Sequence, residues 1–340
     1  MKKVFITTAL VLLTFGVSRM WANVITVSNN TINAGQYTSL QTALDNSLVD
    51  DTIYVHGSPN DYGNSTVYVK RRVTIIGAGY APVGTQYNWK TTISYISLDS
   101  VPFTDPISGT KIIGVDGYSL NSDAGINDVV VERTQIDYIY VEGDGWMIHN
   151  NITYGIDCGN HSNLYIDNNL LGYVNYSNSV SVVISNNIFS LYSWDAFYSM
   201  TNALITNNIF WYCTATNGTS ACTFNKNITM NSSSQILPPA GNSGSGNLNN
   251  TNPQFMDTSI PTSSVSTSSA PGYDWHLKNT SPGKNAGTDG SDIGIYGGTY
   301  PAPNLTGASR IPQMTLMNIG NAVVPQGGNL NVNFKARKQN

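Results

Sequence analysis

One histidine and several carboxylates in the middle of the chain are the side chains best suited to acid–base chemistry. A glycoside hydrolase uses a pair of carboxyl groups, one as the general acid and one that activates water or attacks the sugar. The candidates for such roles are Asp137, Asp144, His149, Asp167 and Asp195. Their spacing is not specific for one class of enzyme, so the sequence predicts no defined catalytic site.

His149 and Asp167 are related by a repeated phrase, because each directly precedes an Asn-Asn pair. If the two phrases lie on stacked strands, the side chains are ~5 Å apart and can form an acid–base or ion pair. The alternative is an ordinary contact between neighbouring strands. The same position continues as Ser185 and Thr206 in the next two phrases, which favours this alternative.

Aromatic residues are concentrated in the same region, and the candidates for sugar binding are Tyr165, Tyr192, Trp194 and Trp211. The apolar face of a pyranose can lie flat on such a ring while the sugar hydroxyls bond to nearby polar groups. We expect the segment YSWDAFY, residues 192–198, to form a loop that presents Trp194. The alternative is that these rings simply suit half-buried strand positions.

A repeat determines where these residues fall in space. The phrases MIHNNIT, YIDNNLL, VISNNIF, LITNNIF and FNKNITM share an asparagine, at steps of 18, 18, 21 and 19 residues. It occurs at Asn151, Asn169, Asn187, Asn208 and Asn227. Self-similarity at about 20 residues indicates a solenoid. Apolar and polar residues alternate within the phrases, so the repeats are strands and the fold is predicted to be all-β, a parallel β-helix.

The repeated asparagines are expected to form a ladder at one corner of the coils. Amides at the same corner of successive coils lie ~4.8 Å apart, so each can donate to one neighbour and accept from the other. Asparagine also tolerates the left-handed backbone conformation of a tight corner. We expect the ladder to face inward. The alternative is an exposed row of amides that binds sugar hydroxyls.

The start of the chain and its charge bear on location and partners. Residues 1–22 resemble a secretory signal peptide, with Lys2 and Lys3 before a short apolar run. We therefore expect an exported protein, periplasmic, surface-bound or secreted, without a membrane span in the mature chain. The net charge of −4 argues against nucleic acid as a partner, because phosphate contacts require a basic stripe.

Three cysteines are present, and Cys213 and Cys222 fall on adjacent turns of the predicted solenoid. They could form a disulfide in an oxidising compartment, which would leave Cys158 single. Both the bridged and the free state remain open. Since there is no CxxC motif and no Cys/His pairing, we predict no metal and no cofactor.

The remaining segments supply the ends of the solenoid, which is predicted to span residues 23–298. A short helix at residues 37–48 would cover its N-terminal end. The asparagine-marked coils occupy residues 146–230, and residues 231–272 are expected to form an irregular excursion. Residues 299–340 are expected to form a strand pair or β cap at the C-terminal end.

Three segments together resemble the pectin-lyase-like superfamily, and within it secreted bacterial right-handed β-helix repeat proteins. They are the opening YTSLQTAL…DDTIYVHG…RRVTIIGAG, the repeated NNIF coils, and the ending HLKNTSPGKNAGTDGSDIGIYGG. The resemblance covers residues 25–298. It implies a right-handed coil and a polysaccharide or cell-surface glycan as partner. It is not specific for chemistry, since this fold carries lyases, hydrolases and adhesive fibres.

The leading hypothesis is a monomer that binds polysaccharide on one strand face, without a readable catalytic site. A divergent polysaccharide lyase or glycoside hydrolase is the alternative. A lyase would need calcium held by carboxylates and a basic residue such as Arg71, Arg72 or Arg133. A structural surface adhesin is the third hypothesis. Exposed Tyr and Trp without a cluster of carboxylates near a basic residue would favour binding.

Overall fold

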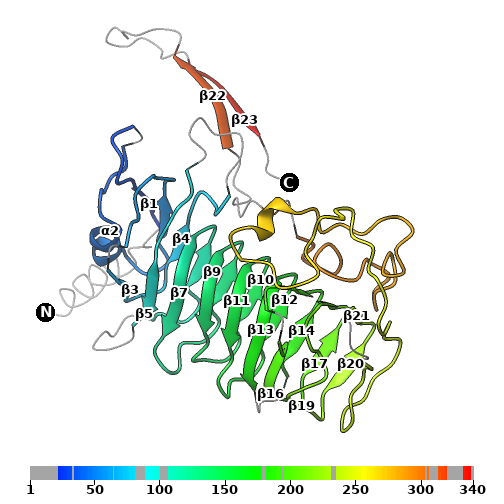
Figure 1. The fold of residues 1–340 in the computed structure, drawn as a ribbon. Helices are drawn as coiled ribbons and strands as arrows, with labels where there is room; N and C mark the ends of the chain where they lie inside the picture. Colours follow the sequence, from blue (N-terminus) through cyan, green and yellow to red (C-terminus); the bar gives the residue numbers. More distant parts are fainter. Residues whose placement is uncertain are drawn as a thin grey trace, which may run out of the picture.

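The computed structural model describes residues 22–32, 34–63, 65–81, 89–99, 106–177, 181–192, 194–230, 235–302, 305, 313–319 and 332–337. The predicted signal segment, Ala22 apart, lies outside the described residues. The described part contains the predicted parallel β-helix, with two long sheets whose strands are contributed in turn by successive coils (Figure 1).

The first sheet, called sheet A, has ten parallel strands. In spatial order they are β1 (Val24–Val27), β2 (Thr52–Val55), β4 (Thr74–Ile76), β6 (Lys111–Ile113), β8 (Val130–Glu132), β10 (Met147–His149), β12 (Tyr165–Asp167), β14 (Val183–Ser185), β17 (Leu204–Thr206) and β20 (Thr223–Asn225).

The second sheet, called sheet B, faces sheet A across the core and is also parallel. Its main path is β3 (Val67–Val69), β5 (Tyr95–Leu98), β7 (Asp116–Ser122), β9 (Gln135–Tyr140), β11 (Ile152–Asp157), β13 (Leu170–Ser177), β15 (Ile188–Phe189), β18 (Ile209–Trp211) and β21 (Ile228–Met230). A side branch, β16 (Phe197–Thr201) and β19 (Thr219–Ser220), continues from β13.

The space between the sheets is filled by columns of apolar side chains. The central residues of consecutive sheet A strands stack in register as Ile148, Ile166, Ile184, Ile205 and Phe224. All five are 0% exposed. Because side chains alternate along a strand, this inward column places the residues on either side of it on the outer face of the sheet.

The first asparagine of each repeated pair makes the sharp corner between sheet A and sheet B. Asn150, Asn168, Asn186 and Asn207 have φ values of 59°, 57°, 54° and 57°, and Lys226 has 55° at the same place in the fifth coil. These values lie in the left-handed region, which asparagine enters more readily than most residues.

The second asparagine of each pair forms a continuous ladder inside the coils. The Nδ2 of Asn151 donates to Oδ1 of Asn169 at 3.1 Å, and equivalent bonds of 3.0 Å continue the ladder through Asn187, Asn208 and Asn227. Each Nδ2 also donates to a carbonyl of the preceding coil, and each Oδ1 also accepts a backbone N–H. The five side chains are at most 1% exposed, so the buried amides have all their partners.

The ladder continues by one coil at each end. The N–H and Oγ1 of Thr134 donate to Oδ1 of Asn151 at 2.8 and 2.9 Å, and Nδ2 of Asn227 donates to Oδ1 of Asn247 at 3.0 Å. Asn247 belongs to residues 235–250, whose backbone forms parallel bridges to β20 and β21. The low periodicity of this stretch predicts an irregular excursion, but the structure forms a further coil. Backbone bonds and one amide suffice to stack it.

The helix α2 (Leu40–Asn46) packs against β1, β2 and β3, near the first coil (Figure 1). The Oγ of Ser39 accepts the N–H of Thr42 and caps its start. It is shorter than the predicted 37–48, because Tyr37 pairs with β1 instead. In the described part of the chain, no helix is long and apolar enough to cross a bilayer.

The C-terminal strand pair predicted from the sequence is present as β22 (Gln313–Ile319) and β23 (Val332–Arg337), which form an antiparallel ribbon (Figure 1). The stacking on the last regular coil is done by residues 235–250. The three cysteines are buried as free thiols, so Cys213 and Cys222 are not bridged.

Residues 251–302, called the returning segment below, run back along the outside of the coils (Figure 1) and include the short 3₁₀ helix η1 (Ala270–Gly272). The segment covers the apolar residue that follows each ladder asparagine, namely Ile152, Leu170, Ile188, Ile209 and Ile228. It contributes its own buried side chains, including Phe255, Trp275, Ile293 and Ile295. The contact forms a second apolar core outside the coils.

The corner asparagines hold the returning segment through their side chains. The Nδ2 of Asn168 donates to the carbonyls of Ile295 and Gly297 at 2.9 and 2.7 Å. Asn207 donates to Oγ1 of Thr288 at 3.0 Å and accepts its N–H at 2.9 Å. In three of the pairs, one asparagine therefore ties coil to coil, and the other (Asn168, Asn186 or Asn207) bends the chain and binds the returning segment.

The ladder provides a first testable prediction. We expect Asn187→Ala to lower the free energy of unfolding by about 3 kcal/mol or more. The substitution leaves several buried donors and acceptors without partners, at a cost of about 1–3 kcal/mol each. Urea denaturation followed by circular dichroism measures this loss. The control is Asn217→Ala, at an exposed amide bonded to Asp195, which should change stability by about 0.5 kcal/mol or less. Equal losses in the two variants would contradict a stabilising role for the ladder.

Candidate functional site

His149 and Asp167 lie in register on β10 and β12 of sheet A. His149 is 5% exposed and its ring centroid lies 5.0 Å from that of Tyr300. Oδ1 of Asp167 is buried and has no hydrogen-bond partner among the described residues. Burial raises the pKa of Asp167 to about 7. His149 is therefore buried beside Tyr300 of the returning segment, whereas Asp167 stays partly exposed.

The other acidic candidates lie in different parts of the coils. Asp144 is on a turn, where its Oδ1 accepts the N–H of Ser162 at 2.7 Å. Asp195 accepts Nδ2 of Asn217 at 2.9 Å in a loop after β15. Asp137 is on β9 and lines a groove on sheet B. The five catalytic candidates thus do not gather at one place.

A row of tyrosine rings runs along the outer face of sheet B and crosses the strands. Neighbouring ring centroids are 5.4–5.8 Å apart, with interplanar angles of 61–86°. The row contains Tyr95, Tyr118, Tyr138, Tyr154, Tyr173, Tyr192 and Tyr198. Edge-to-face contacts of this kind favour a defined ring arrangement. The row is therefore an ordered aromatic surface.

Glycine at position 155 is needed for this arrangement. A Cβ placed on Gly155 would lie 2.4 Å from the Tyr173 ring, which is closer than any normal contact. The ring of Tyr173 therefore occupies the space that a side chain at position 155 would take.

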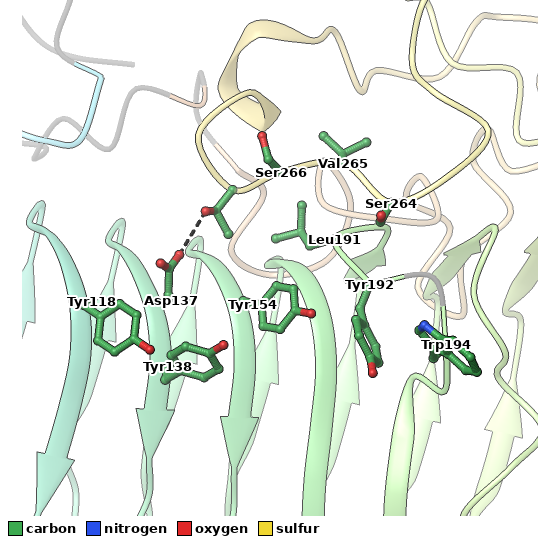
Figure 2. A pocket seen from close by; sticks show the side chains of 11 residues that line it. Tyr118, Asp137, Tyr138, Tyr154, Leu191, Tyr192, Trp194, Ser264, Val265 and Ser266 are labelled. Atoms are coloured by element: carbon green, nitrogen blue, oxygen red, sulfur yellow. Dashed lines mark hydrogen bonds between the residues drawn. The ribbon is translucent and has the colours of Figure 1, made fainter.

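A groove of about 550 Å³ lies between the tyrosine row and the returning segment (Figure 2). Figure 2 shows the rings side by side on successive coils, with Asp137 beside them and residues 264–266 facing them. The coils contribute Tyr118, Asp137, Tyr138, Tyr154, Leu191, Tyr192 and Trp194. The opposite side is made by Ser264, Val265, Ser266 and Thr267. We call these four residues the lip.

The lip is held against the coils by two hydrogen bonds. The N–H of Val265 donates to the carbonyl of Ser190 at 2.9 Å, and Oγ1 of Thr267 donates to Oδ1 of Asp137 at 2.9 Å. The side chain of Val265 is 2% exposed and belongs to the outer apolar core. The groove is thus formed by two well-anchored surfaces.

The four rings proposed for sugar binding have different environments. Tyr192 and Trp194 line the groove, and Trp194 is 69% exposed. Tyr165 is 49% exposed but lies on sheet A. Trp211 is 7% exposed and its Nε1 donates to the carbonyl of Pro261 at 2.8 Å. Packing under the returning segment leaves Trp211 no face for a sugar, which corrects the expectation for that residue.

The groove also contains residues that sequence reasoning did not single out, namely Tyr118 and the lip. The coil of Tyr118 lacks the Asn-Asn phrase, so the repeat does not mark it. The lip lies in a Ser/Thr-rich stretch and reaches Asp137 across a sequence separation of 130 residues. No local signal in the sequence indicates that contact.

The phenol groups of the row are set up to donate hydrogen bonds. Burial, with smaller contributions from neighbouring phenols and carboxylates, raises the pKa of Tyr138 and Tyr198 and raises the pKa of Tyr173 to about 12. These hydroxyls stay protonated at neutral pH, so each can donate to a sugar oxygen. The groove thus offers apolar ring faces and polar ring tips together.

The lining does not fit a calcium ion. Calcium takes about six to eight oxygen ligands, usually with several carboxylates among them, whereas Asp137 is the one carboxylate among the described residues that line the groove. No group of three or more His, Cys, Asp and Glu residues within the described ranges could hold a metal ion.

Comparison with known proteins adds no assignment of chemistry, since no protein-family model and no curated protein matches the sequence.

The buried carboxyl of Asp167 gives a pH prediction. Its folded-state pKa, about 7, is above the ordinary value of 3.8. The folded protein therefore holds the proton of Asp167 more tightly than the unfolded chain does. The resulting contribution to the free energy of unfolding is fully present at low pH and is lost as the pH rises through about 7. The difference between Asp167→Asn and wild type in unfolding free energy should grow in favour of the variant by up to about 4 kcal/mol between pH 4 and 8. Denaturant titrations across this range measure the difference.

Ser185→Asn is the matched control, because it places the same amide at the next position of the column without removing a titrating group. Its difference from wild type should not vary with pH. A difference for Asp167→Asn that is equally flat would show that Asp167 has an ordinary pKa in the folded protein.

Proposed function

We propose that the protein binds a polysaccharide in the groove between the tyrosine row and the lip. The observation that carries the proposal is the row itself, with Trp194 at one end of the groove. Tyrosine and tryptophan offer large apolar faces together with polar tips, a combination suited to sugar rings. Asp137 and the lip serines add polar groups beside the rings.

The resemblance of residues 25–298 to the pectin-lyase-like superfamily supports the same reading, because members of that group generally act on or bind polysaccharides. The signal-like residues 1–22 extend the proposal to an exported protein that meets its glycan in the periplasm, at the cell surface or outside the cell. A monomer suffices for this role, because one chain supplies both sides of the groove.

Binding is better supported than cleavage. A hydrolase of the two-carboxylate type needs a second carboxyl group across the sugar from the first, and a lyase needs a base beside a uronate. The described lining provides Asp137 without a second carboxylate and without a basic side chain. The proposal is therefore a carbohydrate-binding solenoid.

The prediction for binding compares exposed aromatic rings of the groove with an exposed ring on sheet A. Trp194→Ala and Tyr118→Ala should each weaken polysaccharide binding about tenfold, which corresponds to about 1.4 kcal/mol for a lost stacking contact. Tyr165→Ala removes an equally exposed ring from sheet A and should leave binding unchanged. Affinity electrophoresis against a panel of soluble polysaccharides gives the three comparisons. Loss of binding in Tyr165→Ala alone would show that the polysaccharide binds on sheet A and not in the groove.

Cleavage is tested on the same panel. We expect no new reducing ends and no ultraviolet-absorbing unsaturated product, with or without calcium. Either product would overturn the non-catalytic proposal, and loss of that product in Asp137→Asn would then identify Asp137 as part of the active site.

A further inference from the structure

We propose that the groove selects neutral polysaccharides and that Asp137 disfavours chains rich in uronic acids. This inference rests on the proposed function, because it names the class of glycan that the same groove takes.

The charge of the groove is the first observation. Of the described residues that line it, Asp137 is the charged one, and Lys, Arg and His are absent from the lining. One oxygen of Asp137 is occupied by the hydroxyl of Thr267. The other oxygen is available to accept a hydrogen bond from a sugar hydroxyl, which a neutral sugar can supply.

Carboxylates on the neighbouring coils add to this charge. Asp157 lies on β11 and Asp195 lies in the loop after β15. Both act on the row: burial is the main cause of the raised pKa of Tyr173 and Tyr198, and the charge of Asp157 adds to the first and that of Asp195 to the second. The field along this part of sheet B is therefore negative.

The basic residues of the same coils do not offset this field. The Nζ of Lys90 lies 2.7 Å from Oδ2 of Asp116, which it neutralises. Lys111 is on sheet A, and Arg133 is 2% exposed. Lys226 occupies a corner of the fifth asparagine-marked coil. Since Lys, Arg and His are absent from the described lining, a uronate lying in the groove would meet Asp137 without a cation among the residues that line it.

The magnitude of the repulsion is sufficient to select between glycans. Two unit charges ~4 Å apart repel by about 1 kcal/mol in water and by about 4 kcal/mol at the effective dielectric constant of a protein surface. The tyrosine row crosses successive coils, so a chain that follows it would present several carboxylates to this field. A neutral chain has the same ring faces to stack and no such cost.

The test is binding of the full-length mature protein to three probes: a soluble glucan, a neutral xylan and polygalacturonate. We expect binding to at least one neutral probe, with affinity nearly constant from about 0.01 to about 1 M salt, a range that shortens the Debye length from ~30 to ~3 Å. Polygalacturonate should bind at least tenfold more weakly at low salt.

Asp137→Asn is the diagnostic variant. It keeps an oxygen for the Thr267 hydroxyl and should raise the affinity for polygalacturonate about fivefold at low salt, whereas the neutral probe, which loses one acceptor oxygen, should bind no more tightly than it does to wild type. Asp144→Asn is the control, because it removes the same charge from a turn outside the groove lining. It should change neither affinity. An unchanged polygalacturonate affinity in Asp137→Asn would overturn the role assigned to Asp137.

The outcomes separate this inference from the proposed function. If polygalacturonate binds more tightly than every neutral probe and Trp194→Ala abolishes that binding, the groove is a glycan site and the neutral selectivity is wrong. If no probe binds, or if binding is indifferent to both Trp194→Ala and Tyr118→Ala, the proposed function itself fails.

Discussion

A buried amide needs a partner at each of its hydrogen-bonding positions, and in this protein the amides of successive coils provide those partners for one another. The ladder from Asn151 to Asn247 fixes the stacking register. A shift of one residue would leave several buried donors and acceptors without partners. It would also turn the side chains of every β-strand to the opposite face of the sheet. The lengths of the connecting loops can vary, as the steps of 18 to 21 residues show. The register cannot.

Because the register is fixed, residues at equivalent positions of successive coils stack in columns. The returning segment covers some of these columns and leaves others exposed to solvent. The column that follows the ladder is covered and becomes a second core. His149 is buried beside that cover, whereas tyrosines of the row on sheet B remain exposed or half-buried. The same segment therefore buries one set of polar residues and forms one side of the groove beside another. Its position separates the covered part of the outer surface from the part that carries the groove.

The strands, the corners and the ladder could be predicted from the sequence, because each depends on residues at a nearly constant offset within the repeat. The tyrosine row could not. Tyr154 follows its ladder asparagine by three residues, Tyr173 by four and Tyr192 by five, so the rings align only after the irregularities of each strand are known. Trp194 is exposed and Trp211 is buried because a segment distant in sequence covers only Trp211. The lip is held in place by a contact between residues 130 positions apart. Non-local packing of this kind leaves no periodic trace in the chain.

The returning segment also bears on how the solenoid comes apart. In a simple array of repeats each unit contacts its neighbours alone, so the end units can fray one at a time. Here residues 251–302 bind side chains from the coil of Ile152 through that of Ile228, and these coils cannot open separately while the segment is in place. We expect the central coils to behave as one cooperative unit with a slow opening rate. A slow opening rate of this kind protects a chain against proteolysis when cleavage of the open state is faster than reclosing.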